Sequence, residues 1–235
     1  ARFPFFLHCV LPENVIHFIL RKSDFNKRKD ILYGYFENHG TAGRLLHTPH
    51  RHAQPLTDKS KNPLLEYNQT APTEAEKRAE ILQQLFGTCH PLTFIEPSFR
   101  CDYGFHIHTH GLTIINYNCV ILDTSPVHIG ANAFIGPGVC LACAGHAMDA
   151  AQRGEGIGTS APITLENDVW IGANATVCGG VTIGAGSVIG AGSVVTHDIP
   201  RGVLAAGNPC RVLRPITEKD RLIPLEITLT ENKIL

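Results

Sequence analysis

The chain has 235 residues, a formal net charge of −1 and a sequence pI near 7.0. This near-neutral charge gives no electrostatic basis for a nucleic-acid or anionic-membrane partner, and no apolar run reaches the roughly 20 residues that cross a bilayer. The eight cysteines are scattered without a dense framework, so we expect reduced thiols and a cytoplasmic protein.

Residues 1–60 are predicted as an N-terminal segment of uncertain structure. Their one chemical feature is a loop with three histidines, His47, His50 and His52. Imidazoles form a metal site only where regular structure holds them in place, and no such element is evident in this segment. We therefore assign no metal to this loop.

Residues 61–92 are predicted as a helical cap. Thr73 is the expected N-cap of a helix, and apolar side chains follow at helical spacing until Gly87, which is expected to end it. These apolar residues are Ala75, Ala79, Leu82 and Phe86. We expect this helix to cover one end of the β structure predicted below or to pack on its side, as the terminal caps of solenoids do.

Three histidines alternate in the short β-like runs that follow. His106, His108 and His110 share one face if residues 105–110 form a strand. One interpretation is a metal site, and the other is a solvent-facing strand edge. The second is favoured because alternation along a strand does not by itself converge three ligands on one point.

A six-residue period organises residues 165–200. An aliphatic residue begins each block, and small or polar residues fill most of the rest: Leu165, Ile171, Val177, Ile183, Ile189 and Val195. Hexapeptide periodicity is typical of a parallel β-helix, whose stacked coils bury together what one coil cannot bury alone. A glycine-rich β-meander is the alternative, but it does not require aliphatic residues in constant phase. We predict an all-β parallel β-helix over residues 93–215, followed by a C-terminal tail at 216–235.

The repeat is interrupted by residues 142–162, which we predict to be a loop that leaves the column. Such loops often carry function, and the start of this one contains the run Ala144-Gly145-His146. The neutral imidazole of His146 is able to act as a general base. Asn116 and Asp123 lie on earlier coils, and stacking is expected to bring them to the same seam as His146. One alternative is that His146 is a structural residue of the loop. Another is a metal cluster of Cys140, Cys143 and His146, which lacks a fourth ligand.

Six motifs, taken in their order along the chain, resemble those of the maltose and galactoside O-acetyltransferases of the hexapeptide-repeat superfamily. The resemblance covers about residues 63–214, and the motifs lie at residues 99–104, 116–123, 126–130, 145–146, 162–172 and 206–212. It implies a left-handed parallel β-helix, a homotrimer, and active sites between neighbouring subunits. It also implies transfer of an acetyl group from acetyl-CoA to a hydroxyl of a sugar or related acceptor, without a metal. Some members of the superfamily acetylate amines, so an amine acceptor is a variant of this hypothesis.

The resemblance also implies roles for individual residues. His146 matches the catalytic base, and a backbone N–H between Trp170 and Ala173 matches the donor to the thioester oxygen. The positions that match the acceptor site, with Trp170 beside the thioester, are Asn116, Asp123, Tyr103 and Trp170. The positions that match the coenzyme A site are Ala173, Gly190, Ala191, Thr196, His197, Arg211 and Arg214. Two other functions suit the same fold: a metalloenzyme like the γ-class carbonic anhydrases, and a trimeric scaffold without catalysis.

Overall fold

The computed structural model describes residues 7–11, 14–18, 44–47 and 61–222, the first three ranges by their backbone alone. The chain divides into two compact units, Ala1–Thr41 and Ala42–Leu235. In the first unit, β1 (Leu7–Leu11) and β2 (Asn14–Phe18) form an antiparallel hairpin. No helix in the described ranges is both long enough and apolar enough to cross a membrane.

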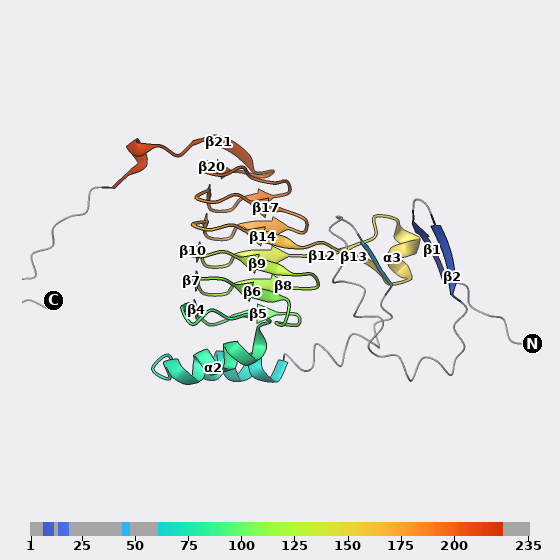
Figure 1. Cartoon of the computed structure of the whole chain (residues 1–235), viewed down its shortest axis with the longest axis horizontal. Helices are drawn as coiled ribbons and strands as arrows, with labels where there is room; N and C mark the ends of the chain where they lie inside the picture. Colours follow the sequence, from blue (N-terminus) through green and yellow to red (C-terminus); the bar gives the residue numbers. More distant parts are fainter. Residues whose placement is uncertain (1–6, 12–13, 19–43, 48–60, 223–235) are drawn as a thin grey trace, which may run out of the picture. The chain divides into compact units, whose positions relative to one another are not determined.

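In the second unit, a three-sided column of parallel strands is stacked coil on coil (Figure 1). Face 1 consists of β4 (Thr93–Ile95), β7 (Thr113–Ile115), β10 (Ala133–Ile135), β15 (Trp170–Ile171), β18 (Val188–Ile189) and β20 (Val203–Ala206), with β21 (Arg211–Pro215) added antiparallel to β20. Face 2 consists of β5 (Arg100–Cys101), β8 (Val120–Leu122), β11 (Cys140–Ala142), β16 (Thr176–Cys178) and β19 (Val194–Val195). Face 3 consists of β6 (Ile107–Thr109), β9 (Val127–Ile129), β14 (Ile163–Leu165) and β17 (Thr182–Ile183). The predicted parallel β-helix is thus confirmed.

The hexad residues form the core of this column. Leu165 is 1% exposed, and the five aliphatic residues that begin the following blocks are fully buried. Burial of each such side chain contributes about 1.5–3 kcal/mol relative to exposure. Neighbouring coils supply the contacts, so the core runs continuously along the axis.

The corners between faces select residues that tolerate a left-handed backbone. Asn118, Asn132, Asp168 and Asn174 have φ between 56° and 62°, a region that Asn and Asp enter more easily than other side chains. Gly172 is required at its corner for a different reason, because a Cβ there would lie 2.6 Å from the backbone nitrogen of Ala191 on the next coil. Small residues in the repeat therefore have a stacking role.

Two helices cover the first coil: residues 61–69 and α2 (Ala75–Leu85). Tyr67 donates its hydroxyl to the Ile95 carbonyl of β4, at 2.5 Å, and Arg78 donates to the same oxygen at 2.6 Å. The expected N-cap at Thr73 is wrong, since Glu74 occupies that position and makes no side-chain cap. The helix ends at Leu85 with Phe86 as its C-cap, and Gly87 is needed next to it because a Cβ there would overlap the Phe105 carbonyl.

The interruption of the repeat forms regular structure of its own. β12 (Ala144–His146) and β13 (Ile157–Ser160) pair antiparallel, and β13 also pairs with β3 (Arg44–His47). Between β12 and β13 lies the short helix α3 (Ala150–Gly154), which Asp149 caps by accepting the Gln152 N–H at 2.9 Å. The chain returns to the column at β14.

Candidate active site

Two lines of corners carry most of the predicted site residues. The first edge joins face 1 to face 2 and carries Asn116, Ala173, Gly190 and Ala191. The second edge joins face 2 to face 3 and carries Tyr103, Asp123, Thr196 and His197, as well as the insertion that holds His146. The two edges are separated by the full width of face 2.

Asp123 is a fully buried carboxylate on the second edge. Its Oδ1 accepts the backbone N–H groups of Asp102, at 3.0 Å, and Tyr103, at 2.9 Å, so it ties two successive coils together. Its Oδ2 is also buried and is not hydrogen-bonded to any described residue. Burial raises the pKa of this carboxyl, an effect that the Tyr103 N–H and the nearby His106 partly offset. A buried oxygen without a partner is a strong acceptor for a hydroxyl that reaches it.

His146 is the last residue of β12 and is exposed. Its position is fixed by the register with β13, in which it lies opposite Gly158. Within the described part of the chain its imidazole has no hydrogen-bond partner, so both ring nitrogens are available to other groups. The pairing of β13 with β3 also links this insertion to residues 44–47, which the sequence pattern did not suggest.

Asn116 lies on the first edge, and its side-chain oxygen accepts the N–H of Tyr117 at 2.8 Å. It directly follows β7, whereas Asp123 directly follows β8, so the two residues lie at opposite ends of β8. The expectation that Asn116, Asp123 and His146 meet at one seam is therefore wrong for a single chain. The physical reason is that a β-strand lies between the two corners, so residues at its two ends are held apart by the length of that strand.

Among the described residues, only one backbone N–H in the range 170–173 has no acceptor, and it is the candidate donor to the thioester oxygen. The backbone N–H of Trp170 donates to the Ser187 carbonyl at 3.0 Å, and that of Gly172 donates to the Ile189 carbonyl at 2.7 Å. Both groups therefore belong to the hydrogen-bond ladder between coils. Ile171 lies within the strand pair of β15 and β10. The N–H of Ala173 is left without an acceptor among the described residues. Trp170 itself is 55% exposed on the outer side of face 1.

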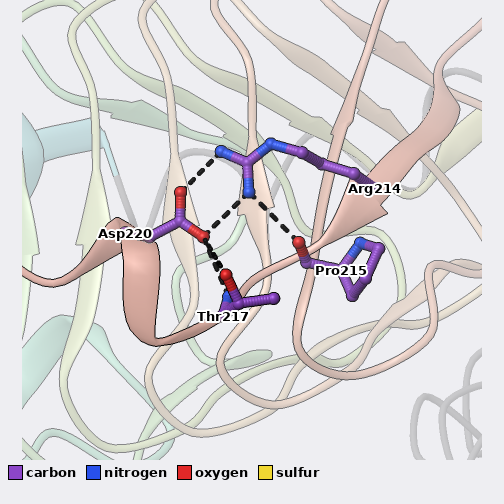
Figure 2. Close-up of polar contacts among 4 residues, drawn as sticks. All are labelled: Arg214, Pro215, Thr217 and Asp220. Carbon is purple, nitrogen blue, oxygen red and sulfur yellow. Dashed lines mark hydrogen bonds and ion pairs between the residues drawn. The ribbon is translucent and has the colours of Figure 1, made fainter.

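The remaining candidates for coenzyme A binding are exposed polar groups. The Thr196 hydroxyl and His197 Nδ1 are 2.9 Å apart on the second edge. On β21, Arg211 donates to the Cys210 carbonyl at 2.9 Å. Arg214 forms a two-bond ion pair with Asp220, at 2.6 and 2.8 Å (Figure 2).

Three histidines of the first coils, His108, His110 and His128, lie together on or beside face 3. The rings of His108 and His128 stack at 4.9 Å, and His110 Nε2 lies 3.3 Å from His128 Nδ1. His106 is directed elsewhere, to the carbonyl oxygen of Asp123 at 2.8 Å, so the three alternating histidines do not act as one set. In residues 61–222, no three His, Cys, Asp or Glu side chains are placed to hold a metal ion.

The alternative metal cluster around His146 is also not formed. Cys143 is buried in the core, whereas His146 is exposed beyond the column, so the two side chains are not placed around one ion. The side chain of His47, together with His50 and His52, lies outside the described residues.

Comparisons with known proteins agree with this architecture. Residues 162–197 match the model of the bacterial transferase hexapeptide family with six repeats, and residues 58–90 match that of the maltose acetyltransferase hexapeptide capping motif. These two matches coincide with the column and with the helices that cover its first coil. They define the class as a hexapeptide-repeat transferase.

Individual relatives specify the class further. The chain is 42% identical to the galactoside O-acetyltransferase of Escherichia coli over 163 residues, 69% of this chain and 80% of that protein. A crystal structure of a maltose O-acetyltransferase from Clostridium difficile 630 is 39% identical, with a TM-score of 0.72, over 75% of this chain and 94% of that one. A galactoside acetyltransferase in complex with coenzyme A is 37% identical, with a TM-score of 0.73, over 82% and 94%. The chain belongs to the maltose and galactoside O-acetyltransferase family, so it is an acetyltransferase.

Proposed function

We propose that the protein transfers the acetyl group of acetyl-CoA to a hydroxyl of a sugar-like acceptor, with His146 as the general base. The observation that carries this proposal is the division of the family-matching residues between two edges of one face. The base and Asp123 lie on the second edge, whereas Asn116 and the Ala173 N–H lie on the first. The solved structure of a relative with coenzyme A supports the choice of co-substrate.

A complete site then requires two copies of the chain. If the second edge of one copy faces the first edge of the next, His146 and Asn116 come together without any change in the column. Closed rotation of such a head-to-tail contact gives a ring, and three copies are what the family resemblance implies. The outer side of face 1 supports contact between copies, because Phe94, Phe134 and Trp170 are large apolar side chains that remain about half exposed.

In the proposed reaction, His146 accepts the proton of the acceptor hydroxyl as its oxygen attacks the thioester carbonyl carbon. The N–H of Ala173 donates a hydrogen bond to the carbonyl oxygen as negative charge develops there. The carbon–sulfur bond breaks, the acetyl group stays on the acceptor oxygen, and the thiolate of coenzyme A receives the proton from His146. No covalent enzyme intermediate is needed.

The other residues hold the two reactants. Asp123 and Asn116 accept hydrogen bonds from acceptor hydroxyls, and Tyr103 lies beside Asp123 on the same corner. Arg211 and Arg214 offer charge-assisted donors to phosphate groups. Because both reactants are bound together, much of the entropy of bringing them together is met by binding.

Release of free coenzyme A thiol from acetyl-CoA, measured against a panel of sugars, simple alcohols and amines, tests this proposal. His146→Ala is expected to lower the rate with the best acceptor by at least ~10²-fold, as for loss of a general base. His110→Ala removes another exposed imidazole, on face 3, and is expected to leave the rate unchanged. If no acceptor drives thiol release, or if both variants keep the full rate, the assignment of His146 is wrong.

A further inference from the structure

Some N–H groups of the Arg214 guanidinium donate hydrogen bonds, and others have no acceptor among the described residues (Figure 2). A guanidinium carries five N–H bonds in a rigid plane. The two hydrogens of Nη1 go to Asp220 Oδ2, at 2.8 Å, and to the Pro215 carbonyl, at 3.1 Å. One hydrogen of Nη2 goes to Asp220 Oδ1 at 2.6 Å. The Nε–H and the second Nη2 hydrogen, which point the same way along one edge of the plane, have no acceptor among the described residues.

Asp220 is itself held in place. The Thr217 N–H donates to its Oδ2 at 2.8 Å in a capping box around the 3-10 helix η1 (Glu218–Asp220). The bond from Arg214 and the Thr217 N–H lower the pKa of this carboxyl to about 2, so it is ionised at any working pH. Arg214, although half exposed, is therefore clamped on one edge by an ordered carboxylate.

We propose that Asp220 is a positioning residue for coenzyme A, holding Arg214 so that its free Nε–Nη2 edge receives a phosphate group of the co-substrate. The inference rests on the proposed function, which assigns Arg214 to phosphate binding. Two parallel N–H groups match two phosphate oxygens, the bidentate geometry that distinguishes arginine from lysine. A clamped guanidinium has already lost the rotamer freedom that a free side chain would lose on binding.

The negative charge of Asp220 has the opposite effect on phosphate binding from its positioning of Arg214. Asp220 neutralises part of the attraction between Arg214 and a phosphate, so a pure charge model predicts tighter binding when Asp220 is removed. At physiological ionic strength the Debye length is about 8 Å, and a phosphate on the opposite edge of the guanidinium would lie within that distance of Asp220, so salt reduces their repulsion without removing it. Orientation of the donors is not screened, so we expect it to dominate in 0.15 M salt.

The experiment is calorimetric titration of the full-length protein with coenzyme A in 0.15 M salt. Asp220→Asn keeps one side-chain acceptor for Arg214 at this position. Asp220→Ala keeps none there, so only the Pro215 carbonyl still accepts from the guanidinium. We expect the affinity to fall in that order, with a loss of about 2- to 12-fold for Asp220→Ala, the cost of ordering one flexible side chain on binding. Glu218→Gln removes the same charge from the same turn and is expected to bind like the unaltered protein.

Two further arms separate positioning from other effects. In an Arg214→Ala background, Asp220→Ala is expected to change the affinity no further, because its effect passes through Arg214. With dephospho-coenzyme A, loss of the Asp220 effect indicates the 3′-phosphate and persistence indicates the diphosphate. Equal or tighter binding by Asp220→Ala, or an equal loss in Glu218→Gln, overturns the proposal. Failure of the unaltered protein to bind coenzyme A would instead contradict the proposed function.

Discussion

Complementation between two impaired variants is the most direct test of the proposed division of the site between copies. His146→Ala damages the second edge, and Asn116→Ala damages the first. If each site combines the second edge of one copy with the first edge of the next, a mixed assembly rebuilds an undamaged site. In this site, His146 comes from the copy that carries Asn116→Ala, and Asn116 comes from the copy that carries His146→Ala.

The expected magnitude follows from counting. If the assembly is the proposed trimer, a mixed trimer contains the variants in a ratio of two to one or one to two. In either composition, an undamaged second edge meets an undamaged first edge at one of the three contacts around the ring. About one third of the sites is therefore intact in every mixed trimer. Alone, His146→Ala is expected to lose at least ~10²-fold in rate. Asn116→Ala is expected to lose about 5- to 150-fold, as for an unmade hydrogen bond in the site.

The assay uses co-expression with two different affinity tags, purification on both tags in turn, and measurement of thiol release per chain. We expect about one third of the unaltered rate in the doubly purified assembly. His146→Ala mixed with Asp123→Asn is the matched control, because both changes lie on the second edge and no site is rebuilt. Activity no higher than the average of the two separate variants would refute a site shared between copies.

Three further predictions concern stability. Gly172→Ala places a Cβ against the backbone of the next coil and is expected to lower the free energy of unfolding by about 1–3 kcal/mol, whereas Gly154→Ala enters open space and leaves the thermal midpoint unchanged. Burial raises the pKa of Asp123, so the stability linked to this carboxyl is present below about pH 4 and is lost as the pH rises through the raised value. The urea midpoint of Asp123→Asn, measured relative to that of the unaltered protein, should therefore rise between pH 4 and pH 7. A difference between the two midpoints that stays constant over this range would contradict the prediction. Burial and neighbouring imidazoles lower the pKa of His108 and His128, so their stability contribution is present above about pH 6.5 and is lost as the pH falls. His128→Asn should lose less urea stability than the unaltered protein between pH 7 and pH 5.5, and equal losses would be evidence against it.

The column could be predicted from the sequence because its signal is local and repeated. Each hexad places one aliphatic residue inside, and Leu165 and Ile171 need only their nearest coils to be buried. The helical cap could also be predicted from the sequence, but the residues at its boundaries could not. Glu74 rather than Thr73 is the N-cap residue of α2, and the close approach of Gly87 to Phe105 depends on how the helix packs against the first coil.

Contacts between distant or irregular segments correspond to no repeated pattern in the sequence. The pairing of β13 with β3 joins residues more than 100 positions apart, without any repeat to set the register. The clamp on Arg214 depends on the turn of η1, which brings Asp220 back over β21. In both cases the sequence shows the residue types, but the geometry arises only from tertiary packing.

The division of the proposed site residues between two edges follows from the period of the column. One block of six residues forms one face, so residues separated by about six lie on neighbouring edges, and residues separated by about three blocks lie on the same edge. Tyr103 and Asp123 are 20 positions apart and meet through a 2.9 Å hydrogen bond. Asn116 and Asp123 are only seven positions apart, and the same rule places them on different edges. Stacking therefore unites residues that are distant in sequence and separates residues that are close, and only contact between copies can bring the two edges together.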